Sequence, residues 1–188
     1  MGPSVYYHHV SRIAEEMFLL AGRLHFTRDT IDSFMRMDDA EGTMTLMQSH
    51  SKAARDLMMR IRCRRLFKRA LYVGRDLVDM PRLTRLDSAS RLRLTREIAE
   101  TAGVDEHAVI LDIPPLRKDM HMEVKVKSMH DYVPFEQLVP LLPLMNTTRQ
   151  EQWRLGVYAA EENVEAVKRA ALSVLGVSSP TKQVRLGL

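Results

Sequence analysis

The sequence predicts an α+β fold, in which an N-terminal helical segment is followed by a ferredoxin-like antiparallel sheet subdomain with a C-terminal helix. Through the first third of the chain, apolar residues recur at three- and four-residue steps, which is typical of amphipathic helices. From residue 66 the pattern changes to short apolar or alternating runs broken by Gly and Pro. These runs predict the order strand, helix, strand, strand, helix, strand, which is the split strand-helix-strand arrangement of ferredoxin-like folds.

Four helices are predicted in the segment 1–63. The first is long and covers 5–24, and the second is short and opens at Thr27. A third begins at Asp38, because Asp38 and Glu41 have the spacing of a capping box, although Gly42 weakens this helix. The fourth covers 51–62, with apolar residues on one side and basic residues facing solvent.

The segment 64–177 is predicted to form the α+β lobe. Residues 66–73 favour a strand that Gly74 stops, and continuation of the preceding helix is the alternative. Pro81 indicates a loop over 79–85. The remaining elements are a helix from Asp87 or Ser88 to Gly103, strands over 108–113, 122–127 and 153–158, a helix over 135–145 that Pro140 and Pro143 interrupt, and a helix over 162–175. The tail 178–188 has no periodicity, and we expect it to be disordered or loosely docked.

The composition of the chain restricts the classes of protein to which it can belong. The chain has 188 residues, of which 45% are hydrophobic and 28% charged, as in ordinary globular proteins. There is no run of about 18 apolar residues that would span a bilayer, and residues 1–4 do not resemble a secretory signal, so we expect a cytoplasmic protein with no membrane partner. Cys63 is the only cysteine, which excludes an intrachain disulfide and a zinc site built on paired cysteines.

Positive charge is concentrated in the middle of the chain. The formal net charge is +4, but Lys52 to Arg96 carries 14 Lys and Arg against four acids. This asymmetry favours a local anionic partner, and a solvated basic helix face is the alternative. The densest group is Arg60, Arg62, Arg64, Arg65, Lys68 and Arg69. Guanidinium forks bind phosphate, and the scarcity of aromatic residues nearby favours polyphosphate over RNA or DNA.

Two further groups of polar residues are candidates for chemistry. Tyr6, Tyr7, His8 and His9 can hydrogen-bond or stack, which suits a nucleotide, although adjacent histidines project about 100° apart on a helix and make a poor metal pair. Core packing and helix capping are the alternative roles. The dipeptide His130-Asp131 matches a metal-binding pair of HD phosphohydrolases, but neither neighbouring pattern supplies the other ligands, and coincidence is the favoured reading. No phosphate-binding loop, nucleophile elbow or zinc helix motif occurs.

Several segments taken together resemble one family. The segment 5–15 (VYYHHVSRIAE) resembles the helix that follows the catalytic core in HD-superfamily phosphohydrolases related to the SAM-and-HD-domain dNTP triphosphohydrolase. The segment 64–68 (RRLFK) is similar to that family's Arg-x-Leu-(Phe/Tyr)-Lys segment. The segments 109–114 (VILDIP) and 152–158 (QWRLGVY) look like the C-terminal lobe of its prokaryotic and archaeal members. The likeness runs in the expected order over roughly residues 5 to 175.

The resemblance implies a non-catalytic, C-terminal part of such an enzyme. In the family the metal-binding His, His-Asp and Asp precede the Tyr-Tyr-His-like helix, so this chain would lack catalytic and metal-ligating residues, and the divalent metal would belong to the full-length enzyme. By position, Tyr6, Tyr7, His8, Arg64 and Lys68 would contact a dNTP or NTP at or near subunit interfaces. The family also implies a homo-oligomer.

Two other functions remain open at this point. A nucleic-acid-binding module would use the basic surface from Lys52 to Arg96, and its affinity would fall steeply with salt. An assembly domain without a ligand would keep that surface solvated.

Overall fold

The computed structural model describes residues 9–116, 124–127, 132–135 and 141–177. The first part is helical, as the sequence predicts, and its helices are α1 (His9–His25), α2 (Ile31–Phe34), α3 (Asp39–Met47) and α4 (Lys52–Arg62). Asp38 and Glu41 form the predicted capping box at the start of α3. Gly42 is tolerated inside this helix because an added Cβ would lie 3.1 Å from the ring of Phe34.

A three-stranded antiparallel sheet forms the centre of the molecule, with the order β1-β5-β2. Its strands are β1 (Lys68–Gly74), β2 (Val109–Asp112) and β5 (Arg154–Ala159). The strand alternative for residues 66–73 is therefore the observed one. The last strand lies between the other two, because Val157 pairs with both Leu71 and Leu111.

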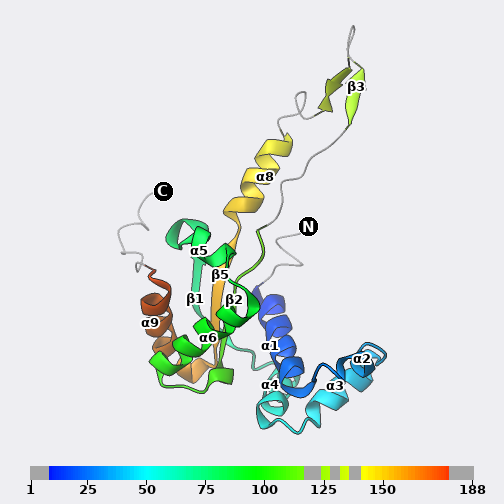
Figure 1. Cartoon of the computed structure of the whole chain (residues 1–188), viewed down its shortest axis with the longest axis vertical. Helices are drawn as coiled ribbons and strands as arrows, with labels where there is room; N and C mark the ends of the chain where they lie inside the picture. Colours follow the sequence, from blue (N-terminus) through cyan, green and yellow to red (C-terminus); the bar gives the residue numbers. More distant parts are fainter. Residues whose placement is uncertain (1–8, 117–123, 128–131, 136–140, 178–188) are drawn as a thin grey trace.

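Helices cover both faces of this sheet. On one face lie α6 (Ser88–Ala102) and α9 (Val164–Leu175), and the other face packs against α1 and α4 (Figure 1). Side chains alternate along β5 accordingly: Leu155 and Val157 join the α6 and α9 cluster, whereas Tyr158 joins the helical cluster of the N-terminal segment. The predicted division at residues 63/64 stays a prediction, and the two segments share the core on this second face.

The α+β class is confirmed, but the ferredoxin-like arrangement is wrong in its sheet. The predicted strand over 122–127 is described from residue 124, and there it forms β3 (Lys125–Lys127), which pairs with β4 (Tyr132–Pro134) in a separate two-stranded sheet. Residues 117–123, 128–131 and 136–140 lie outside the described part, as do 1–8 and the predicted tail 178–188. The alternating pattern specified a strand without specifying its partner.

Two other elements differ from their predictions. The predicted loop 79–85 contains a short helix, α5 (Met80–Thr84), because Asp79 caps it and Pro81 occupies the first turn, where its missing N–H costs nothing. The predicted helix 135–145 is described in part, and the helix there is α8 (Leu141–Glu151), which continues six residues further. Short 3-10 turns cover Arg75–Leu77, Glu106–Ala108 and Glu161–Asn163. In the described part, no helix is long and apolar enough to cross a membrane.

Candidate anion-binding site

The connection between α4 and β1 is a tight turn that contains an arginine in a backbone conformation that glycine favours. Arg64 has φ 55°, and the N–H groups of Arg64 and Arg65 donate to the carbonyls of Ile61 and Arg60 at 3.1 and 2.9 Å. Equivalent bonds close α6 at Gly103 and α9 at Gly176, whose φ values are 69° and 64°. Three helices thus end in the same way, and only α4 does so with a side chain in the left-handed region, at a cost of about 1 kcal/mol or more.

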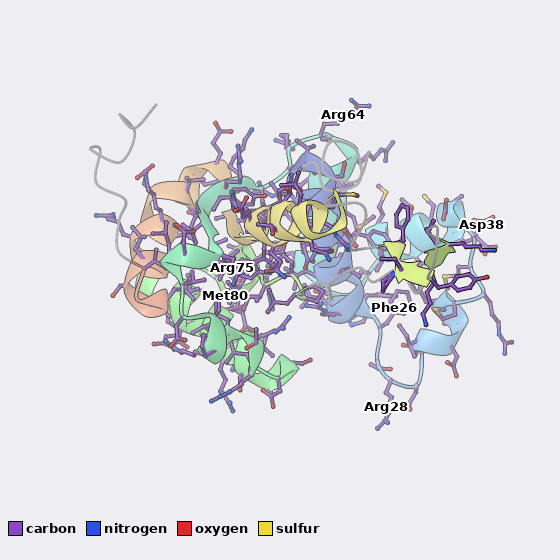
Figure 2. The ribbon with its side chains drawn as sticks, turned by 90° about the horizontal axis from the view of Figure 1, so that it is seen from above. Phe26, Arg28, Asp38, Arg64, Arg75 and Met80 are labelled. Carbon is purple, nitrogen blue, oxygen red and sulfur yellow. The ribbon has the colours of Figure 1, made fainter. Side chains whose placement is uncertain are left out.

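Four cations stand free around this turn, and we call them the basic turn: Arg62, Arg64, Arg65 and Lys68. All four are exposed, and none forms an ion pair with any residue that the structure describes. Figure 2 shows Arg64 directed away from the ribbon into solvent. The positive charge of the basic turn is therefore available to a partner outside the described chain.

Arg60 and Arg69 belong to the same sequence cluster but are engaged within the fold. The Arg60 guanidinium lies 2.9 Å from Asp56 and 3.4 Å from Glu162, and it stacks 5.8 Å from the centre of the Phe67 ring. The hydrogen bond that Arg60 donates to Asp56 contributes most to raising the pKa of Arg60. Arg69 lies over the ring of Tyr72 at 5.2 Å. The predicted six-residue cluster therefore divides into two anchoring cations and four free ones.

Of the sequence-predicted site residues, the structure places Arg64 and Lys68 at the basic turn. Tyr6, Tyr7 and His8 lie outside the described residues. The neighbouring Phe67 is buried, and its N–H contacts the sulfur of Met17, in the middle of α1, at 3.3 Å. The first residue of α1, His9, is eight residues before Met17, so it lies about 12 Å further along the helix axis. Phe67, next to the basic turn, thus contacts α1 about 12 Å along the axis from the first residue of the helix.

Sequence reasoning missed a buried polar group that fixes α1 to the sheet. Asp112, at the end of β2, is 3% exposed and receives two hydrogen bonds from Arg12, at 2.8 and 2.9 Å. The hydroxyl of Tyr158 donates to the same carboxylate at 3.4 Å. Burial and the charge of Asp112 raise the pKa of Tyr158, so the hydroxyl stays protonated as a donor. The signal in the sequence was a lone acid within an apolar strand.

The Arg12 side chain is also bordered by two glutamates of its own helix. Glu15 and Glu16 lie 3.2 and 2.9 Å from its guanidinium. Burial is the largest cause of a raised pKa at Glu16, and the negative charge of Asp112 adds to it, while Arg12 opposes both. The hydrogen bond that Arg12 donates to Asp112 is the largest cause of the raised pKa of Arg12. The Arg12 guanidinium thus forms ion pairs with three carboxylates. We therefore interpret this group as a contact that fixes α1 to the sheet rather than as an anion-binding site.

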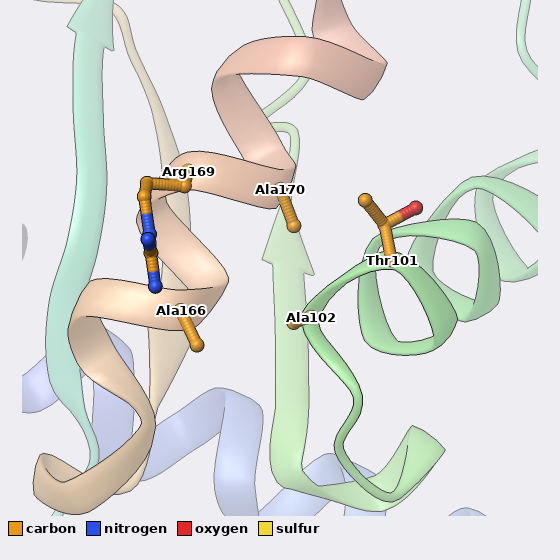
Figure 3. A pocket seen from close by; sticks show the side chains of 5 residues that line it. All are labelled: Thr101, Ala102, Ala166, Arg169 and Ala170. Atoms are coloured by element: carbon orange, nitrogen blue, oxygen red, sulfur yellow. The ribbon is translucent and has the colours of Figure 1, made fainter.

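Hollows also lie elsewhere on the described surface, two of them next to arginines. The first, of about 260 Å³, lies between α6 and α9, where small side chains bring the helices together (Figure 3). The second, of about 310 Å³, lies beside Trp153 at the end of β2. The Trp153 indole donates to the carbonyl of Pro114 at 2.8 Å and holds the two ends of the β2–β5 connection together. Each hollow is lined by one arginine, Arg169 or Arg91, among mostly small or apolar residues, so the basic turn remains the stronger candidate for an anion.

A metal centre does not fit the described side chains. Within residues 9–116, 124–127, 132–135 and 141–177, no three His, Cys, Asp or Glu side chains converge as metal ligands. The His130-Asp131 dipeptide lies outside those ranges. We therefore assign no metal-dependent step to the described residues.

Residues 1–186 match the model of a protein family described as the HD associated region. No curated protein matches the sequence.

Proposed function

The chain belongs to the family of HD-associated regions, and from this premise we propose that it is the C-terminal, non-catalytic part of an HD-domain phosphohydrolase of the dNTP triphosphohydrolase type. Within the enzyme it would contact nucleotide and mediate oligomerisation. The match supports an accessory region of an HD-domain protein, and the nucleotide contacts and oligomerisation are our inference.

The basic turn carries the proposal for nucleotide contact. Its three guanidinium groups can each present a planar fork to phosphate oxygens, and Lys68 adds a point charge. Arg64 keeps a backbone conformation that glycine would adopt without strain, as in α6 and α9. Strained residues are enriched at functional sites, where a side chain is retained for its function although it lowers the stability of the fold. A polyphosphate is the ligand that this arrangement suits best.

The start of α1 would serve a different part of the same ligand or a neighbouring copy. By the family resemblance, Tyr6 and Tyr7 would line the part of the substrate pocket that holds the base and the sugar, and His8 would lie beside them. The separation of about 12 Å along α1 argues against a single phosphate group touching both the basic turn and this helix start. At a subunit interface, the basic turn of one copy and the start of α1 of another copy could contact the same nucleotide from two sides.

Catalysis would reside in the HD domain rather than in this chain. Hydrolysis in HD enzymes uses bound metal to supply an activated water. The described residues offer no ligand set for it. The chain would hold and position the nucleotide, and the purified chain should not hydrolyse it.

A thermal-shift titration tests this proposal. The purified chain is titrated with dNTPs and NTPs, with and without magnesium or manganese, and release of phosphate is assayed in parallel. Nucleotide that binds only the folded state should raise stability by about 2.7 kcal/mol at a hundredfold excess over Kd. We expect this stabilisation without turnover, and Arg64→Ala with Lys68→Ala should abolish it.

A matched control removes the same charge elsewhere. Arg85→Ala with Lys168→Ala removes two exposed cations, one at the C-terminal cap of α5 and one in α9, and should leave the stabilisation intact. Metal-dependent phosphate release would contradict the non-catalytic role. Polynucleotide affinity that falls steeply with salt and resists nucleotide competition would favour the nucleic-acid-binding function, and no shift with any nucleotide would favour an assembly domain.

A further inference from the structure

The hollow beside Trp153 combines a buried apolar lining with one cation. Its buried lining residues are Leu83, Ile113 and Trp153, and Arg91 lies among them. These residues come from α5, from α6, from the segment after β2 and from the residue before β5, so four parts of the chain enclose the hollow. Ligand pockets typically have this composition, in which a mostly apolar lining carries a few polar groups that orient the ligand.

Arg91 is the charged residue of this lining, and most of its donors are free. The side chain is half-buried, and within the described part of the chain its guanidinium donates one hydrogen bond, to the carbonyl of Ile113 at 3.3 Å. It forms no ion pair with any residue that the structure describes. A partly buried cation without an anionic partner has lost hydration that nothing replaces. A bound anion would supply the missing partner.

The number of cations and the volume of the hollow restrict the ligand. One guanidinium matches one carboxylate with two parallel hydrogen bonds, whereas a polyphosphate calls for several cations. The volume of about 310 Å³ equals that of about ten water molecules in the liquid, so a ligand of about ten non-hydrogen atoms would fill it. Met80, Leu83 and Ile113 make much of the lining aliphatic, which suits an alkyl chain.

We propose that this hollow binds a medium-chain fatty acid. The carboxylate pairs with Arg91, and the alkyl chain lies against Leu83, Ile113 and Trp153. Charge complementarity selects the head group of the ligand, and the volume selects its length. This is a second ligand site, which goes beyond the nucleotide contact proposed above.

The fatty-acid site is separate from the basic turn. Lys68 of the basic turn begins β1, and Gly74 ends the same strand, where it pairs with Arg154 next to Trp153. Six residues of strand span about 20 Å. Figure 1 shows α5, which lines the hollow, beside the end of the sheet at which β1 stops. Fatty acid and nucleotide should therefore bind independently of each other.

Fluorescence titration of the full chain with octanoate tests the proposal. Trp153 is the only tryptophan in the sequence and lines the hollow, so its emission reports on the ligand directly. Octanoate should change this emission in a saturable way. Octan-1-ol, which has the same chain length without the charge, should bind at least about tenfold more weakly, because hydrogen bonds between charged groups contribute more than neutral ones. No saturable change with octanoate, or equal affinity for the acid and the alcohol, overturns the proposal.

Substitutions locate the carboxylate. Arg91→Gln should weaken octanoate binding at least about tenfold and leave octan-1-ol binding unchanged. Arg93→Gln is the matched control, because Arg93 is an exposed cation two residues further along α6, and this variant should bind octanoate like the wild type. Unchanged octanoate affinity in Arg91→Gln overturns the proposal. If Arg91→Gln does not fold, the comparison of acid and alcohol in the wild type still decides.

A last variant separates this site from the nucleotide contact. Arg64→Ala with Lys68→Ala removes two cations of the basic turn and should leave octanoate binding unchanged. Loss of octanoate binding in this variant would mean that the fatty acid binds at the basic turn, which overturns the assignment to the hollow. The octanoate titrations contain no nucleotide, so their failure is distinguishable from failure of the proposed nucleotide contact.

Discussion

At the scale of single residues, Arg64 places a positive charge at the turn at the expense of the stability of the fold. Its left-handed backbone costs about 1–3 kcal/mol, whereas glycine adds about 0.4–1 kcal/mol of chain entropy to the unfolded state. Arg64→Gly should therefore raise the free energy of unfolding by about 1 kcal/mol, measured by urea denaturation, while weakening nucleotide binding. Gly103→Ala, in the equivalent position of α6, should lower stability by a similar amount. A destabilised Arg64→Gly variant would show that the side chain itself stabilises the turn.

Glu16 gives the protein a pH-dependent stability. Its pKa is raised above the ordinary value of 4.5, chiefly by burial, so the folded state holds this proton more tightly than the unfolded chain. The stability that Glu16 contributes is fully present below about pH 4.5 and is lost as pH rises through the raised pKa. Glu16→Gln should thus be more stable relative to wild type at pH 7 than at pH 4, measured by thermal unfolding across that range.

At the scale of elements, the Arg12–Asp112 pair decides how α1 docks on the sheet. Asp112→Asn would leave the Arg12 guanidinium, 27% exposed, facing a neutral partner. Breaking an isolated buried pair costs about 3–5 kcal/mol, and the loss here should be smaller, because Glu15 and Glu16 still lie against the Arg12 guanidinium. The double variant Arg12→Gln with Asp112→Asn should recover part of this loss, and a double-mutant cycle in urea measures the coupling. Purely additive losses would mean that the pair does not act as a unit.

The elements themselves were largely predictable because their signals are local. Helix periodicity and the cap at Asp38 specified α1 to α4, and Gly103 marked the end of α6. The partner of a strand depends on residues far away in the chain, so the pattern at 124–127 could not show that β3 pairs within a hairpin. The same holds for the site: a cluster of arginines is visible in the sequence, but the division between anchored Arg60 and free Arg64 requires the positions of Asp56 and Glu162.

At the scale of the whole molecule, β5 joins the two halves of the core. One of its faces packs against α6 and α9 and the other against the helices of the N-terminal segment, so neither layer can lose its packing without exposing the central strand. A molecule built in this way should unfold in one cooperative transition.

Met17→Ala tests that cooperativity, because Met17 is fully buried in the helical cluster while the only tryptophan, Trp153, lies in the cluster on the opposite face. The cavity should cost about 2–5 kcal/mol. If the layers are coupled through β5, urea unfolding followed by Trp153 fluorescence should shift to lower urea by the same amount as unfolding followed by far-UV circular dichroism. Met35→Ala, at an exposed site, should shift neither signal. A Trp153 transition that stays in place while the dichroism transition moves would mean that the segments 1–63 and 64–177 unfold as independent domains.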